Sequence, residues 1–538
     1  MSLLRMAMIA SALSVAFGSS SPAASAAERE DAKAVGSRRA SIVYINDVHA
    51  QLEPHPELFW SGAEEEYVRD AGGLSRIATV FNRLRAERPG ELLFVDGGDT
   101  IQGSGPAAWT EGKVVVDPMN ALGLDVAIPG NWSIAYGPSP WKTRAQEFTY
   151  EVVAANMRDG QSGELLFEPY TIRTINGIRF GIIGFTEPDI PTRQPPHLSE
   201  GLAFQAEEVL PPLVSELREE HRVDVVVLAT HIGLPKAIGL AETIDGIDII
   251  LSADTHERTY EPIVRGDTWI VEAGAFGSFV GLLDLRIDEQ GEIVDRAWRL
   301  IELRPELYPE DPEMKRSVDA SLAPHRERMN RVIGHTDIWL ARYEVLNTSL
   351  DNVIADAIRE ETGADIGLSN GFRFAPPTAP GPITEADLWT WLPLRLELKT
   401  GQASGAQLHK YWEKELENSL SKDPQKLFGG WLPRVSGLTV DFRMHAAAGE
   451  RLERLRIGGE PVDEHQMYTL AAGNRQGAPE DYIHRVSGCQ LTQLQEINTH
   501  DAVENYLRRH SPIRADRELS VRCLDSPGVL RSQILNSL

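Results

Sequence analysis

Cysteine is scarce in this sequence: its 538 residues include only Cys489 and Cys523, both in the last fifth of the chain. Two cysteines without a CxxC motif exclude a cysteine-rich zinc module and a thioredoxin-like redox motif. They predict either one disulfide or two free, buried thiols, and their spacing does not decide between these alternatives.

Positive charge and long apolar runs are also scarce. Lysine and arginine total 53 against 79 aspartates and glutamates, which gives a formal net charge of -26 and a pI near 5.0. A nucleic acid or an anionic membrane would favour a basic surface, so this balance argues against both partners. Beyond the N-terminus, no stretch approaches the roughly 20 apolar residues that a membrane-spanning helix needs.

Residues 1–26 are typical of a secretory signal peptide. Arg5 precedes an apolar run from Met6 to Phe17, and small residues follow at Ala24 to Ala26. The run is too short to span a bilayer, so we expect a cleaved leader and a periplasmic or secreted protein. The alternative is a disordered N-terminal extension.

The length of the chain exceeds what one hydrophobic core usually supports, so two domains are expected. Over residues 40–303, apolar runs of strand length alternate with amphipathic helical stretches, which predicts a layered α/β domain. Residues 304–331 begin with a segment rich in proline and acids and continue as a charged helical stretch, which predicts a linker helix. Residues 332–538 have strands and helices of their own and form the second predicted domain.

Five short polar clusters follow five apolar runs in the first predicted domain. Ligands of open α/β sheets bind at the carboxyl ends of the strands, so side chains at these ends converge in space. Oxygen and nitrogen donors gathered there suit two divalent cations that share a carboxylate. One Asp-x-His motif alone would be weak evidence, and the order and placement of all five clusters carry the prediction. The candidate ligands are Asp47, His49, Asp99, Asn131, His231, Asp254 and His256.

These clusters resemble the motifs of the calcineurin-like metallophosphoesterases, and more closely those of the 5'-nucleotidase family. The resemblance implies an α/β metallophosphoesterase sandwich domain, joined by a linker helix to a second α/β domain of the 5'-nucleotidase C-terminal type. It also implies a two-metal hydrolase in which Asp99 bridges the cations. One cation would then be completed by Asp47, His49 and His256, and the other by Asn131, His231 and Asp254.

The second domain extends the resemblance. Residues 369–373 are similar to a substrate-binding loop of the family, and residues 429–431 are similar to its Gly-Gly-aromatic segment. The resemblance implies that Asn370 and Arg373 bind the anionic part of a substrate and that Trp431 stacks on a nucleobase. The alternatives are an Arg373 in a domain salt bridge and a Trp431 in a core.

Three departures from the family pattern bear on the activity. Family phosphatases place a histidine after the asparagine of the third motif and an aspartate three residues later, where this chain has Trp132 and Ala135. A positioned acid or base contributes about a hundredfold to ten-thousandfold in rate, so the rate of phosphomonoester cleavage should be lower without this pair.

The other two departures concern the metal ligands and the substrate. Asp254 stands where the family usually has a metal-binding histidine, and it favours manganese over zinc unless it only caps a turn. No second stacking aromatic follows the strand near Tyr468.

Thiosulfohydrolases of the SoxB type lack the same histidine, and the chain is similar to them in Trp132 and in Tyr136-Gly137. A persulfide is a thiolate-like leaving group, and a thiol pKa of roughly 8.5 makes its protonation unimportant. We therefore predict an exported hydrolase that releases sulfate from a cysteine S-thiosulfonate. The substrate would be either a small anionic molecule or a carrier protein with a thiosulfonated cysteine. Asp99, Asn131, Trp132 and Arg373 would act at the reacting centre. Trp132 either shapes the pocket or fills a core.

Two other functions stay open on the sequence. A 5'-nucleotidase or another phosphoesterase is favoured by the family-wide motifs and by Asn131. A non-catalytic binding protein is favoured if Asp254 does not bind a metal. The sequence does not indicate an oligomeric state.

Overall fold

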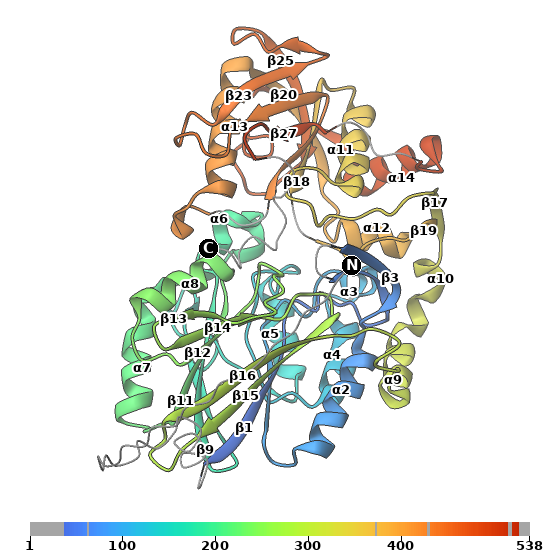
Figure 1. Cartoon of the computed structure of the whole chain (residues 1–538). Coiled ribbons are helices and arrows are strands. Elements are labelled where there is room, and N and C mark those ends of the chain that lie inside the picture. The colour runs from blue at the N-terminus through green and yellow to red at the C-terminus, as the bar shows by residue number, and fades with distance from the viewer. Residues whose placement is uncertain (1–36, 62–63, 372–373, 428–430, 515–518, 527–538) are drawn as a thin grey trace, which may run out of the picture.

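The computed structural model describes residues 37–61, 64–371, 374–427, 431–514 and 519–526. The predicted signal peptide, Arg373 and the Gly429-Gly430 pair lie outside the described residues. Figure 1 shows two blocks of secondary structure, one blue to green and one yellow to red, that meet along one edge. They correspond to the two halves that the sequence pattern separates.

The first block contains a six-stranded sheet in the order β16-β15-β1-β4-β5-β6. β1, β4, β5 and β6 run parallel, and β15 runs antiparallel to β1. From Ala40 to Ile45, β1 is buried on both faces, as expected for a strand covered by other layers on each side. The strands are β1 (Arg38–Ile45), β4 (Leu92–Asp96), β5 (Val126–Ala127), β6 (Glu151–Val152), β15 (Phe279–Ile287) and β16 (Ile293–Glu302).

A second six-stranded sheet has the order β13-β14-β12-β11-β9-β8. Its central strands β9, β11, β12 and β14 are parallel to one another. The strands are β8 (Tyr170–Ile175), β9 (Ile178–Thr186), β11 (Val225–His231), β12 (Ile249–Ser252), β13 (Ile263–Arg265) and β14 (Thr268–Glu272).

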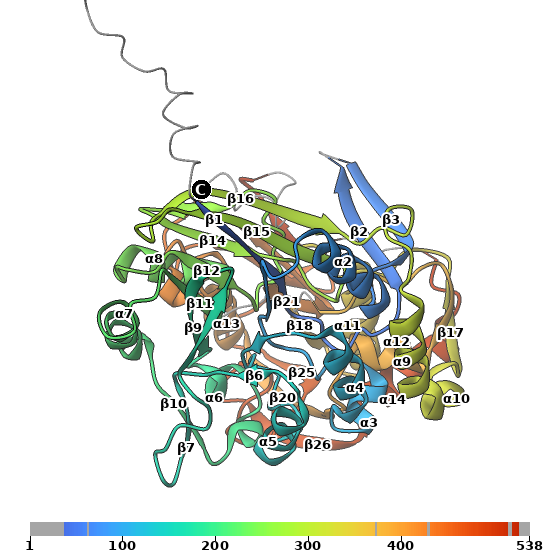
Figure 2. The ribbon, with the colours of Figure 1, turned by 90° about the horizontal axis from the view of Figure 1, so that it is seen from below.

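The two sheets pack face to face. Ile42 and Val95 of the first sheet share one buried cluster with Val227 and Leu251 of the second. Figure 2 shows helices on the two outer sides of this sandwich. The layered α/β prediction is therefore confirmed. The helices are α2 (Leu74–Glu87), α4 (Lys113–Leu122) and α9 (Pro312–Leu322) on the first sheet, and α7 (Leu210–Glu219) and α8 (Leu234–Thr243) on the second.

The segment predicted as a linker helix contains α9 and, after a short turn, α10 (Arg326–Met329). The Asp311 carboxylate accepts hydrogen bonds from the backbone N–H groups of Glu313 and Met314 and so caps the start of α9. Met314 and Val318 are buried in the same cluster as α2 and α4. The front half of this segment is thus part of the outer layer of the first block.

The second block is built on a five-stranded sheet in the order β21-β18-β25-β20-β26, with a smaller sheet β24-β23-β22-β27 beside it. Helix α13 (Gly405–Leu420) packs in one buried cluster, and α11 (Ser349–Thr362), α12 (Glu385–Trp391) and α14 (Thr499–His510) pack in another. Cys489 and Cys523 are both free thiols. The strands are β18 (Ile366–Gly371), β20 (Glu397–Ser404), β21 (Trp431–Ser436), β22 (Leu438–Phe442), β23 (Leu452–Ile457), β24 (Glu460–Pro461), β25 (Met467–Gly473), β26 (Gln490–Asn498) and β27 (Val521–Cys523).

Among the helices of the described ranges, none combines the length and the apolar character that crossing a bilayer requires.

A hairpin of β2 (His55–Ser61) and β3 (Glu64–Ala71) joins the first block to the second. The Tyr67 ring stacks on Trp339 with centroids 4.5 Å apart. The Tyr343 hydroxyl donates a hydrogen bond of 2.7 Å to Oε1 of Glu57, which is fully buried. The same oxygen accepts from the guanidinium of Arg258 at 3.0 Å. A buried ion pair with a shared hydroxyl donor therefore sits at this junction.

Replacing Glu57 by alanine should lower the free energy of unfolding of the first block by about 3–5 kcal/mol, because the charge of Arg258 would stay buried without its partner. Urea unfolding followed by circular dichroism measures the change. Arg83→Ala, which breaks an ion pair on the exposed face of α2, is the control and should leave the midpoint unchanged. An unchanged midpoint in Glu57→Ala would contradict a structural role for this pair.

Candidate metal centre

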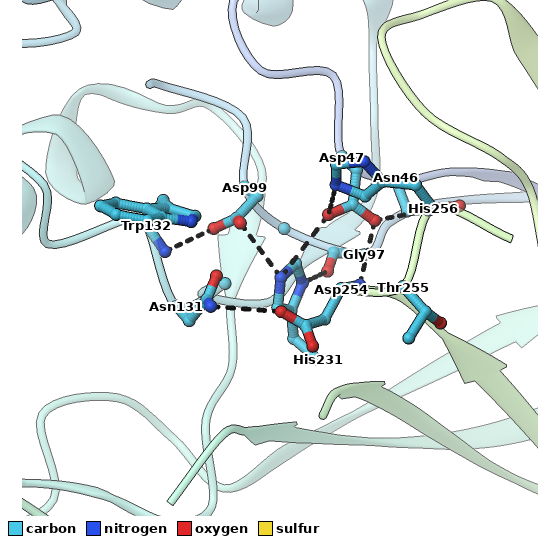
Figure 3. A network of polar contacts seen from close by, with 12 residues as sticks. Asn46, Asp47, Gly97, Asp99, Asn131, Trp132, His231, Asp254, Thr255 and His256 are labelled. Carbon is cyan, nitrogen blue, oxygen red and sulfur yellow. Dashed lines mark hydrogen bonds and ion pairs between the residues drawn. The ribbon is translucent and has the colours of Figure 1, made fainter. Parts of the chain in front are cut away.

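The five predicted polar clusters all lie at the carboxyl ends of parallel strands. Asp47 and His49 follow β1, Asp99 follows β4 and Asn131 follows β5 in the first sheet. In the second sheet, His231 is the last residue of β11, and Asp254 and His256 follow β12. Because the two sheets pack face to face, these ends meet at one edge of the sandwich, and Figure 3 shows most of the side chains directed toward one another.

One group of ligand atoms consists of Asp47, His49 and His256. The Nε2 atoms of the two histidines are 3.1 Å apart, and Oδ1 of Asp47 lies 3.3 Å from Nε2 of His256 and 3.7 Å from Nε2 of His49. The His49 Nδ1 atom faces the carbonyl oxygen of Gln102 at 3.0 Å. This contact favours a proton on Nδ1 and leaves the Nε2 lone pair for a metal.

A second group consists of Asp47, Asp99 and His231. Nε2 of His231 lies 3.2 Å from Oδ2 of Asp99 and 3.6 Å from Oδ1 of Asp47. Its Nδ1 atom faces the carbonyl oxygen of Gly97 at 2.7 Å, which again directs Nε2 into the site. Oδ1 of Asp47 belongs to both groups, whereas the sequence predicted Asp99 as the shared ligand. Oδ2 of Asp99 also lies 3.8 Å from Nε2 of His49, so both carboxylates face both positions.

The buried polar atoms of this site fit divalent cations. Oδ1 of Asp47, Oδ1 of Asn131 and Nε2 of His231 are buried and form no well-aligned hydrogen bond with other described residues. Buried polar atoms without such partners are unfavourable, and most in native proteins are satisfied. Oxygen and imidazole donors of this kind bind manganese, iron and zinc, and two cations can share a carboxylate. These residues therefore form a candidate two-metal centre.

The backbone around the site is held in an unusual conformation. Asp47, His49, Asp99, Asp254 and His256 have φ angles of 51°, 49°, 55°, 80° and 56°, in a region that non-glycine residues rarely adopt. Such conformations are unfavourable and concentrate at functional sites, where the surrounding structure enforces them. The clustering of five of them at one point supports a functional role for this edge.

Burial and charge together shift the pKa values at the site. Burial opposes ionisation of Asp47, but the neighbouring His256, His231 and His49 outweigh it and hold the pKa of Asp47 well below its usual range. Burial lowers the pKa of His49 to about 4, so this ring is neutral at pH 7, as a metal ligand must be. Burial alone would also lower the pKa of His231, but the Asp99 and Asp47 carboxylates raise it well above its ordinary value. The carboxylates thus favour a cation here.

Asp254 lies beside Asn131 (Figure 3). The Asn131 amide donates a hydrogen bond of 3.1 Å to Oδ1 of Asp254. The guanidinium of Arg193 lies 3.2 Å from the same oxygen and 3.1 Å from Oδ2. Arg193 also pairs with the buried Glu187 at 2.7 Å. The sequence did not single out Arg193, which ends helix α6 (Ile190–Arg193), because no motif marks it.

Trp132 lies next to Asp99, and its backbone N–H donates a hydrogen bond of 2.7 Å to Oδ1 of that carboxylate (Figure 3). Its ring is half-buried and packs against the core of the first sheet and its helices. Trp132 thus packs partly on the core and is partly exposed. Ala135 is buried and carries no proton that could be transferred.

The second block reaches the site through the segment after β18. The ring of Phe374 meets the ring of His49 edge-on at 4.5 Å, and Phe276 of the first block lies 5.2 Å from His256. These two phenylalanines cover the first group of ligands with apolar surface, and the sequence did not identify Phe276. Asn370 on β18 faces Nε2 of His484 through Oδ1 at 2.6 Å, and Trp431 begins β21 beside it.

Comparisons with known proteins agree with this architecture. Residues 40–258 match the calcineurin-like phosphoesterase family, and residues 332–475 match the 5'-nucleotidase C-terminal domain. The structure is similar to the sulfate thiohydrolase SoxB of Thermus thermophilus, with a TM-score of 0.82, 25% identity, and coverage of 91% of this chain and 98% of that one. It is also similar to a 5'-nucleotidase precursor of the same organism, with a TM-score of 0.78, 25% identity, and coverage of 91% and 100%.

Among curated proteins, the chain is 25% identical over 492 residues to the trifunctional nucleotide phosphoesterase protein YfkN of Bacillus subtilis. The match covers 82% of this chain and 32% of that protein, so the chain spans about a third of the length of this relative.

Replacing Asp47 by alanine should remove both metal ions, because its Oδ1 atom belongs to both groups of ligand atoms. Metal content after dialysis, measured by mass spectrometry, tests this expectation. Asp284→Ala, on β15 and away from the site, is the control and should retain the metal content of the wild type. Two retained ions in Asp47→Ala would exclude this carboxylate as a ligand.

Proposed function

We propose that this chain, which belongs to the 5'-nucleotidase family of calcineurin-like metallophosphoesterases and is a metal-dependent hydrolase, cleaves a sulfur-anion ester such as a cysteine S-thiosulfonate. The observation that carries the proposal is Trp132, which stands beside Asp99 where family phosphatases place a catalytic histidine. Ala135 likewise stands in place of the aspartate that would orient it. The centre thus keeps candidate metal ligands but lacks the histidine that would act as the acid.

The leaving group explains why that loss is tolerable for a sulfur substrate. In the proposed reaction, the oxygen of water bonds to the terminal, sulfonate sulfur, and the bond between this sulfur and the neighbouring sulfur breaks. The electron pair leaves with the sulfur that stays on the cysteine, which yields a persulfide, sulfate and protons released to solvent. A thiol-like leaving group with a pKa of roughly 8.5 needs no proton in this step, whereas an alkoxide does.

The remaining requirements of the reaction are water activation, charge neutralisation and a pocket for the substrate. Two divalent cations, when bound, lower the pKa of a water molecule and neutralise charge that develops on the substrate oxygens. Asp47, Asp99 and the histidines would hold these cations, and the mixed oxygen and nitrogen donors suit manganese, with zinc as an alternative. The half-buried Trp132 would line the pocket beside the reacting sulfur.

The second domain would hold the remote part of the substrate. Asn370 and Trp431 lie on neighbouring strands of its sheet, and Arg373, three residues after Asn370 in the sequence, lies outside the described residues. Arg475, in the segment where the family's second stacking aromatic is expected, instead donates hydrogen bonds of 2.9 Å to the carbonyl oxygens of Thr192 and Gln194. An arginine committed to the other domain offers no stacking ring, which supports a substrate without a nucleobase.

A 5'-nucleotidase or another phosphoesterase is the second candidate. The matches to a 5'-nucleotidase structure and to a nucleotide phosphoesterase favour it, as does the presence of Asn131. For either substrate, we propose that the protein is exported, on the strength of the signal peptide pattern in residues 1–26.

Turnover of two substrates tests the proposal. The mature protein with manganese should release sulfate from cysteine S-thiosulfonate with a kcat/KM at least about a hundredfold above that for phosphate release from AMP, because one positioned acid is worth that much. The inactive Asp47→Ala variant serves as the control for contaminating activities. Faster cleavage of AMP than of the thiosulfonate would overturn the sulfur proposal and leave the phosphoesterase.

Restoring the missing acid pair provides a second test. The double variant Trp132→His/Ala135→Asp should gain AMP hydrolysis, by about tenfold or more, because it reintroduces a proton donor beside Asp99. Steady-state kinetics on AMP measure the gain, and Trp132→Phe, which adds no donor, is the matched control. An equal gain in Trp132→Phe would mean that the ring blocks access and that proton transfer is not the limit.

A further inference from the structure

The carboxylate of Asp254 is already occupied by protein partners. Both of its oxygens lie within 3.2 Å of the Arg193 guanidinium, and Oδ1 also accepts from the Asn131 amide. Neither group of candidate metal ligands includes Asp254. The second group, with Asp47, Asp99 and His231, therefore lacks the donor that the sequence pattern led us to expect from the loop after β12.

Arg193 is held firmly in this place. Its side chain is 11% exposed, and its other terminal nitrogen pairs with Glu187, which is fully buried. Lys236 contacts the same glutamate at 3.1 Å. A guanidinium stays protonated in proteins, so Arg193 is a permanent positive charge beside the second metal position.

The segment that carries Arg193 is fastened from two further sides. The Gln194 side chain donates a hydrogen bond to the carbonyl oxygen of Asn131, at the end of the first sheet. Arg475 of the second domain donates to the carbonyl oxygens of Thr192 and Gln194. Arg193 is thus positioned by contacts from both domains, and a free rotation of its side chain away from Asp254 would break a buried ion pair.

We propose that Arg193 keeps Asp254 out of metal coordination and so makes the two metal positions unequal. The position at Asp47, His49 and His256 binds its cation tightly, and the position at Asp47, Asp99 and His231, beside Asn131, binds its cation weakly. The physical reason is the ion pair itself: while its carboxylate is held by Arg193, Asp254 does not bind the second cation, and that position has one anionic ligand fewer. Arg193 is a positioning residue in this scheme, and the inference rests on the proposed metal-dependent function.

Titration of the metal-free, full-length mature protein with Mn²⁺ tests the inference without any substrate. Isothermal titration calorimetry should resolve one tight site and a second site at least about tenfold weaker, since loss of ligand or supporting contacts changes metal affinity by about 10–100-fold. Arg193→Met should tighten the second site by about tenfold or more, because Asp254 becomes available as a ligand. Asp254→Ala should leave the affinity of the second site within about threefold of the wild type.

A matched control exists at the other end of β12. Arg218 pairs with Asp248, which precedes this strand as Asp254 follows it, so Arg218→Met removes an equivalent ion pair away from the metals. This variant should leave both Mn²⁺ affinities unchanged. Circular dichroism and thermal unfolding show whether each variant is folded, and Asp254→Ala decides the question if Arg193→Met does not fold.

Three results would count against the inference or its premise. Two equally tight sites in the wild type, with one weakened in Asp254→Ala, would identify Asp254 as a ligand and overturn the inference alone. An unchanged second site in Arg193→Met would overturn it as well. Failure of the wild type to bind Mn²⁺, Zn²⁺ or Fe²⁺ would instead overturn the proposed metal-dependent function.

Discussion

The structure depends on opposite charges that are buried together where the carboxyl ends of the two sheets meet. Oδ2 of Asp47 is fixed by the Asn46 amide at 2.6 Å and by the backbone N–H of Asp254 at 3.1 Å. This leaves Oδ1 pointing at three imidazoles in a buried space. Such a carboxylate is tolerable only with compensating positive charge, which a proton or a metal can supply. The strained backbone of the surrounding loops persists because both sheets hold it in place.

The second domain contacts the metal centre and the segments around it. Phe374 closes the apolar side of the first metal group, and Arg475 fastens the segment that carries Arg193. Tyr343 adds a third connection through the buried Glu57, whose partner Arg258 lies two residues after His256. Two of these contacts reach loops that present metal ligands, and the one from Arg475 ends on the segment that carries Arg193.

The departures from the family pattern concentrate in one half of the site. Trp132 follows Asn131 directly in the chain, Ala135 lies three residues further on, and Asp254 accepts a hydrogen bond from the Asn131 amide. The half with Asp47, His49 and His256 keeps the expected residues. A substrate with a good leaving group places smaller demands on the altered half, because neither proton donation nor full charge neutralisation at the leaving atom is needed.

The sequence by itself indicated the strands that precede the five polar clusters, the loops at their ends and two blocks of secondary structure, because apolar periodicity and motif spacing are local properties. It also identified the seven candidate ligands and the missing histidine, because each motif is a short stretch of sequence and the motifs follow one another in the family's order. Only the tertiary structure decided that Asp47 faces both metal groups, that Arg193 binds Asp254 and that Phe374 covers His49. These partners are far apart along the chain or on another domain, and their pairing depends on how the two sheets and two domains pack.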